Sequence, residues 1–115
     1  MSFGSVKPLE HRRSSKWPSV RRAFLRGHGS CACCGGRVKL EVHHVIPFQV
    51  DSSLELVPSN FVVLCEGKKT INCHLIVGHG GDYKDFNPSV LVDAEHMRVL
   101  FSERQFAKCL SKGGV

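Results

Sequence analysis

LEVHHVIP, residues Leu40–Pro47, is the stretch that decides the fold. Apolar and polar residues alternate from residue 38 to residue 43, and this period of two predicts a β-strand. Pro47 ends the run, since proline has no amide hydrogen for a strand ladder. In an ideal strand His43 and His44 point to opposite faces, so one site can use both only if the strand twists, bulges or ends there.

Two pairs of cysteines have the spacing of metal ligands. Cys31 and Cys34 form a C-x-x-C motif followed by two glycines, which is the pattern of a zinc knuckle. Cys65 and Cys73 supply a second pair, separated by a short loop. One pair alone would be ambiguous between zinc and redox chemistry, whereas two pairs predict a tetrahedral, structural four-thiolate zinc site. Cys33 is an alternative ligand to either of its neighbours.

Further helices and strands are predicted before and after the strand of residues 38–43 in the sequence. A second apolar run, Phe61–Leu64, predicts a strand that pairs with the first across a long loop. The tail from residue 89 is rich in β-branched residues and permits a strand as well as a helix. Apolar periodicity and capping residues predict helices at Lys16–Arg26 with Ser15 as N-cap, at Ile71–Val77 with Thr70 as N-cap, at Ser89–Val99, and from Ser102 to about Leu110.

Length, composition and charge restrict the class of protein. A chain of 115 residues is expected to form one domain, and its apolar runs are too short for a signal peptide or a membrane span. We therefore expect a cytoplasmic protein whose six cysteines stay reduced. The net charge of +6 resides in residues 1–26, where seven basic residues face one acidic residue. A basic arm of this kind indicates nucleic acid, with a merely solvated tail as the alternative.

The motifs, taken in their order along the chain, resemble the HNH endonucleases, and most closely the phage and prophage type. The resemblance runs from about Ser14 to Asn87 and fades beyond Pro88. It is carried by these residues: Cys31-x-x-Cys34, Leu40-Glu41-Val42-His43-His44-Val45-Ile46-Pro47-Phe48, Leu54-Glu55-Leu56-x-Pro58-x-Asn60, Leu64-Cys65-Glu66, Asn72-Cys73-His74-Leu75 and Gly78-His79-x-Gly81.

This resemblance implies a role for each matching residue. His43 and His74 would bind a catalytic divalent cation, and His44 would be the general base that activates water. Asn60 would orient the loop and the base. His79 is a further candidate for contact with the metal or a phosphate. A neutral imidazole, with a pKa of about 6.5, suits proton transfer near neutral pH.

Cofactors and partners follow from the same resemblance. The expected ions are a structural Zn²⁺ and a catalytic Mg²⁺, Mn²⁺ or similar divalent cation, because soft thiolates and the open hydrolytic site prefer different metals. The expected partner is double-stranded DNA, and phage terminase subunits are a further expected partner in DNA packaging. The chain is expected to be a monomer. If it is encoded by a phage, its location would be the cytoplasm of the host. Candidates for contact with the DNA backbone are Arg21, Arg22, Lys68, Lys69 and Lys84, for each of which plain solvation is the alternative.

The sequence thus predicts a small α+β protein with a ββα-metal core, flanking helices and a structural zinc. Residues 1–14 would be a flexible basic arm, and residues 15–115 would be a single nuclease domain with its core at about 31–87. The predicted activity is DNA hydrolysis by a histidine base and one catalytic cation. The main alternative is a non-catalytic, zinc-stapled DNA-binding module, and a third option is an RNA-directed nuclease.

Overall fold

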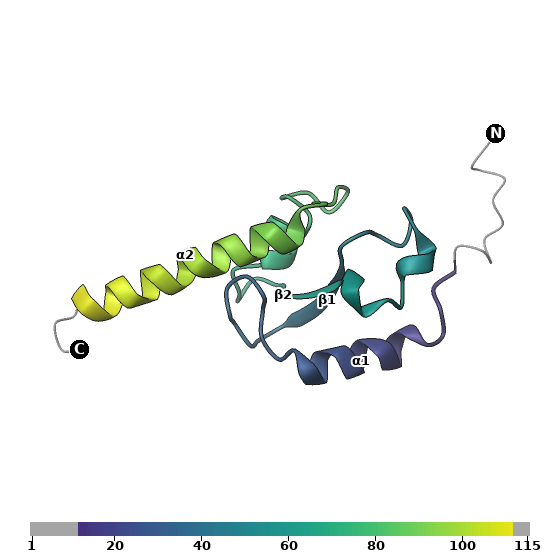
Figure 1. The fold of residues 1–115 in the computed structure, drawn as a ribbon, viewed down its shortest axis with the longest axis horizontal. Helices are drawn as coiled ribbons and strands as arrows, with labels where there is room; N and C mark the ends of the chain where they lie inside the picture. The colour runs from purple at the N-terminus through teal and green to yellow at the C-terminus, as the bar shows by residue number, and fades with distance from the viewer. Residues whose placement is uncertain (1–11, 112–115) are drawn as a thin grey trace.

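The computed structural model describes residues 12–111, and their side chains as far as residue 103. A two-stranded antiparallel sheet lies at its centre, and helical elements flank both faces, so the protein is a small α+β structure (Figure 1). The first eleven residues of the predicted basic arm lie outside the described part. The elements are α1 (Trp17–Gly27), β1 (Leu40–His44), the 3₁₀ turns η3 (Ser52–Leu54) and η4 (Pro58–Asn60), β2 (Phe61–Cys65), the π-helical turn η5 (His74–Gly78) and α2 (Val90–Ser111).

Both predicted strands form, and they pair with each other. Leu40 lies opposite Cys65 and His44 lies opposite Phe61 in an antiparallel register. β1 starts at residue 40 rather than 38, because Lys39 has a φ of 56°, which is incompatible with an extended strand. The loop between the strands folds back on itself through η3 and η4. The pairing therefore places the end of the histidine strand beside the start of β2.

Helix α1 covers one face of the sheet. Its apolar side chains, from Trp17 to Leu25, pack against a buried cluster of Val42, Phe61 and Val63. The predicted N-cap, Ser15, is wrong: the helix starts one residue later, and Lys16 holds the N-cap position without a side-chain cap.

The opposite face is covered by the cysteine loop, by η5 and by the first turns of α2. Val62 and Leu64 of β2 are buried here, together with Val90 and Ala94 of α2. The remainder of α2 extends away from the sheet (Figure 1). Because side chains of a strand alternate between faces, His43 points toward this second layer and His44 points toward α1.

The predicted helix at Ile71–Val77 is wrong in its start and in its type. Asn72 has a φ of 61°, a left-handed conformation that interrupts a helix. Thr70 does not cap a helix; its hydroxyl accepts a hydrogen bond from the Asn72 amide within a turn, at 3.0 Å. The helical turn begins at His74, and it has the wide π geometry. This geometry matters for the histidines, as described below.

The C-terminal segment forms one helix rather than two. α2 runs from Val90 to Ser111 without a break at Ser102, so the predicted capping box and separate last helix are wrong. The physical reason is that no glycine or proline interrupts residues 90–111, and nothing else in the segment stops a helix. Across residues 12–111, no helix combines the length and the apolar character that a membrane crossing requires.

Candidate functional site

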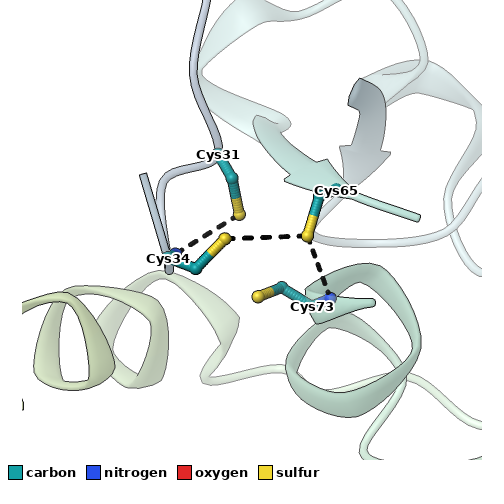
Figure 2. Close-up of side chains that lie close together, drawn as sticks. All are labelled: Cys31, Cys34, Cys65 and Cys73. Carbon is teal, nitrogen blue, oxygen red and sulfur yellow. Dashed lines mark hydrogen bonds between the residues drawn. The ribbon is translucent and has the colours of Figure 1, made fainter. Parts of the chain in front are cut away.

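Four cysteines from three segments meet beside the second face of the sheet. Cys31 and Cys34 come from the loop before β1, Cys65 ends β2, and Cys73 precedes η5. Their sulfurs all lie within 4.8 Å of one another and point toward a common centre (Figure 2). The Cys34 and Cys65 sulfurs are 3.7 Å apart. A tetrahedral zinc with Zn–S bonds of about 2.3 Å separates its sulfurs by about 3.8 Å, so the cluster could hold a zinc ion.

Backbone amides stabilise the thiolate form of this cluster. The Gly36 amide donates to the Cys34 sulfur at 3.4 Å, and the Cys73 amide donates to the Cys65 sulfur at 3.4 Å. Gly35, with a φ of 80°, allows the tight turn that presents these groups. The same turn leaves Cys33 buried but outside the group of four ligands, which decides the alternative left open by the sequence.

The protonation of the cysteines also fits a bound cation. The neighbouring Cys73 thiol and burial together raise the pKa of Cys31 to about 12. Burial raises the pKa of Cys34 to about 11. Buried thiols with raised pKa values lose their protons at neutral pH only when a cation compensates the charge. Zinc would supply that compensation, since thiolates are its preferred ligands.

Three histidines form a second cluster nearby. His43 comes from β1, His74 begins η5, and His79 follows its end. One nitrogen of each ring lies within 4.8 Å of the others, and the Nε2 atoms of His74 and His79 are 3.3 Å apart. The predicted pair of His43 and His74 is thus brought together, and His79 joins it as a third potential ligand.

The π-helical geometry of η5 is what brings His79 into the cluster. In an α-helix, residues five positions apart point about 140° away from each other. In η5 the His79 amide instead donates to the His74 carbonyl, five residues back, at 3.1 Å. This wider turn places both rings on the same side. π-Helical turns are rare, and those that do occur are often found at functional sites.

Hydrogen bonds orient the rings of the cluster toward a common point. His79 uses its Nδ1 to donate to the Asp85 carbonyl at 2.7 Å, and His74 uses its Nδ1 to donate to the Glu66 carboxylate at 2.5 Å. In their neutral form both rings therefore present the Nε2 lone pair to the centre. The Nε2 of His43 is buried and has no hydrogen-bond partner among the described residues. Facing lone pairs and an unpartnered buried nitrogen fit a metal ion at this point.

Burial keeps His43 in the form that binds metal. Its side chain lies beneath η5, and burial, together with the nearby His74 and His79, lowers its pKa to about 3. The imidazole is thus neutral at physiological pH, as a metal ligand must be.

Gly78 determines how closely η5 approaches His43. A Cβ at this position would lie 3.2 Å from His43 Cε1 and 3.0 Å from Leu64 Cδ1, closer than ordinary van der Waals contact.

We expect Gly78→Ala to displace the His43 ring at a cost of about 1–3 kcal/mol, and to weaken Co²⁺ binding by the zinc-loaded chain about tenfold or more. Calorimetric titration measures the Co²⁺ affinity. Gly27→Ala is the control, since nothing lies within 4 Å of a Cβ there; equal affinities for both variants would contradict the expectation.

His44 lies on the α1 side of the strand, in an arrangement that suits a base. Its ring is 4.5 Å from that of Trp17, centroid to centroid. Its Nε2 is 2.8 Å from the Glu55 carbonyl, and because a carbonyl can only accept, Nε2 carries the hydrogen. In the neutral ring the Nδ1 lone pair is then free to take a proton. Burial lowers the pKa of His44, so this neutral form prevails at pH 7.

Asn60 forms hydrogen bonds within the loop between β1 and β2, whose Glu55 carbonyl contacts His44. Its side-chain amide joins both backbone groups of Ile46, accepting from the amide at 2.9 Å and donating to the carbonyl at 3.0 Å. It also donates to the Leu54 carbonyl at 3.3 Å, next to the Glu55 carbonyl that contacts His44. Asn60 thus acts on the loop directly and on His44 through the backbone, without touching the ring.

One cleft of about 640 Å³ contains both histidine groups. His44 reaches it because β1 ends at this residue, so its opposite orientation to His43 does not separate the two. Arg13 extends into the cleft from the segment before α1, with its guanidinium 3.8 Å from Glu55 and 4.8 Å from the centre of the Phe48 ring. Lys84 also lines it. The lining thus includes two basic side chains and one acidic side chain, Asp85, beside the histidines. Arg13 and Lys84 could attract an anionic substrate.

The other basic candidates lie elsewhere. Arg21 pairs with Glu41 at 3.2 Å, and Arg22 is exposed on α1. Lys68 and Lys69 line a separate groove together with Lys39. The structure therefore joins only Lys84 of the five predicted contacts to the cleft.

Sequence reasoning gave no role to one charged residue beside the histidine cluster, Glu66. Arg13, by contrast, belongs to the basic segment that the sequence associates with nucleic acid. Glu66 directly follows Cys65 and lies eight residues before His74, a spacing that becomes informative only when the turn between them is known.

No family model matches the chain, and neither a curated protein nor a solved structure shows significant similarity to it.

Proposed function

We propose that this protein is a metal-dependent DNA endonuclease of the HNH kind, with a ββα-metal core formed by β1, β2 and η5. The observation that carries the proposal is the meeting, in one cleft, of His44, whose Nε2 is bound to the Glu55 carbonyl, and of three histidines that each bring one ring nitrogen within 4.8 Å of the others. Phosphodiester hydrolysis requires these two components, a base for water and a centre of positive charge for the phosphate.

Each residue has a defined part in the proposed reaction. His44 takes a proton from the attacking water at Nδ1, while the Glu55 carbonyl holds its Nε2–H and fixes the ring. His43, His74 and His79 would hold a divalent ion, which polarises the phosphate and stabilises the departing 3′ oxygen when bound. Arg13 and Lys84 attract and position the phosphate backbone. The expected products carry 5′-phosphate and 3′-hydroxyl ends.

The donor set refines the choice of catalytic ion. Mg²⁺ prefers oxygen ligands, whereas imidazole nitrogens suit Zn²⁺, Ni²⁺, Cu²⁺ and Fe²⁺. With three imidazoles as the protein ligands, we place transition metals ahead of Mg²⁺ among the divalent cations. The four cysteines are proposed as a separate, structural zinc site.

The test is cleavage of supercoiled plasmid by the zinc-loaded chain in a series of added ions. We expect nicked or linear product with Mn²⁺, Co²⁺ or Ni²⁺, a slower reaction with Mg²⁺, and none after the added ion is chelated. RNA added as competitor separates a DNA enzyme from an RNA-directed one. If the chain binds DNA but does not cut it with any ion, the non-catalytic DNA-binding module replaces the nuclease proposal.

A further inference from the structure

Glu66 contacts the three-histidine cluster from outside. Its Oε1 accepts a hydrogen bond from His74 Nδ1 at 2.5 Å, and the Tyr83 hydroxyl donates to the same oxygen at 3.3 Å. His74 directs its other nitrogen, Nε2, toward His79. The carboxylate, the imidazole and the centre of the cluster thus lie in sequence.

The cysteine cluster holds both members of this pair in place. Glu66 directly follows Cys65, and His74 directly follows Cys73, so each member is next in the chain to a sulfur ligand. The Cys73 amide donates to the Cys65 sulfur at 3.4 Å, which ties the two backbones together. The Glu66 amide also donates to the Lys39 carbonyl at 2.8 Å and extends the pairing of the strands by one residue.

The hydrogen bond between Glu66 and His74 would also affect metal binding by His74. A histidine that binds a metal through one nitrogen commonly donates its other N–H to a carboxylate, which fixes the tautomer and the ring plane and strengthens the metal-facing lone pair. Loss of such a partner typically costs about 10–100-fold in metal affinity. A negative charge behind the ring also favours a cation in front of it.

The competing explanation is that the two side chains form an ion pair that only stabilises the fold. The exposure of Glu66 to solvent argues against this explanation. The Glu66 side chain is 39% exposed and that of His74 is 17% exposed. Solvent screens the exposed Glu66 carboxylate, so the charge of this pair contributes little to folding. We propose that Glu66 is the positioning residue of the three-histidine centre, holding His74 in the Nδ1–H tautomer that offers Nε2 to the metal. This inference rests on the proposed function, in that the centre binds a divalent ion.

The test compares Glu66→Gln with a matched control in the full, zinc-loaded chain. Glu41→Gln is the control: Glu41 is 42% exposed and pairs with Arg21, away from the histidines. Calorimetric titration with Co²⁺ measures affinity, and nitrogen chemical shifts of the His74 ring report its tautomer without metal or DNA. We expect Glu66→Gln to weaken Co²⁺ binding about 10–100-fold and to lose the fixed tautomer, with an unfolding temperature close to that of Glu41→Gln.

Each other outcome has a definite meaning. If Glu66→Gln binds Co²⁺ as tightly as the wild type and keeps its tautomer, the positioning role is wrong, whatever the wild type does to plasmid. If both variants lose affinity equally, the effect is one of general charge and the inference also fails. If the wild type, loaded with one zinc ion per chain, binds no second ion, both this inference and the proposed metal chemistry fall. If Glu66→Gln weakens binding but the wild type cuts no DNA, the inference stands and the nuclease proposal fails.

Discussion

His44→Ala is expected to reduce plasmid cleavage by about 10²–10⁴-fold, the contribution of a positioned general base. The substitution removes the Nδ1 lone pair from the cleft and keeps every member of both clusters of possible metal ligands, since His44 belongs to neither. Single-turnover cleavage at saturating metal measures the loss. DNA affinity and metal content should stay at their wild-type values, because the phosphate contacts and the ligands remain.

Two further variants keep this prediction testable. The ring of His44 packs on Trp17 and occupies the Glu55 carbonyl, so alanine also removes structural contacts. His44→Gln can retain an N–H donor for that carbonyl but offers no base, and it should be as inactive as alanine. His28→Ala is the control, because His28 is exposed and stacks on Phe24 away from the cleft. Cleavage by His44→Gln at the His28→Ala rate would exclude His44 as the base.

Cys65→Ala is expected to unfold the protein at room temperature. Structural zinc sites contribute about 10–16 kcal/mol in zinc-finger peptides, whereas whole domains are stable by only about 5–15 kcal/mol. The cluster joins the end of β2 to the cysteine loop and to η5, so loss of the ion separates three segments. Circular dichroism and bound zinc per chain measure the effect. Chelation of zinc from the wild type should give the same spectrum.

Cys33→Ala is the matched control for the zinc prediction. Cys33 is as fully buried as Cys65 but lies outside the group of four ligands. It should bind zinc and remain folded, with only the modest cost of losing one buried sulfur. A folded Cys65→Ala variant with the unfolding temperature of Cys33→Ala would show that the four cysteines do not hold a structural ion.

The sequence predicted those features that depend on short-range periodicity and on ligand spacing. The alternation before His43 fixed the strand and its pairing with residues 61–65. The amphipathic segment that starts near Trp17 gave α1 to within one residue. The four cysteines could be predicted because the two members of each pair lie close together in the sequence at a spacing typical of metal ligands.

Other features depend on contacts that no local pattern contains. The π-helical turn brings His79 to His74, and Gly78 in the same turn lies close to His43 of another layer, a contact between elements that no local pattern contains. The contact of His44 with the Glu55 carbonyl joins residues eleven apart through a folded loop. Ser102 resembles a helix N-cap, but a serine within a segment free of glycine and proline does not interrupt a helix, and α2 continues through it.

The adjacency of Cys73 and His74 has a consequence for how the protein matures. If the cysteines hold zinc as proposed, that ion fixes the start of η5 and with it the position of His74. We therefore expect the thiolate site to fill first and the imidazole site to form only afterwards. Under the proposed function, a chain that lacks zinc would therefore be inactive in cleavage until its thiolate site is filled.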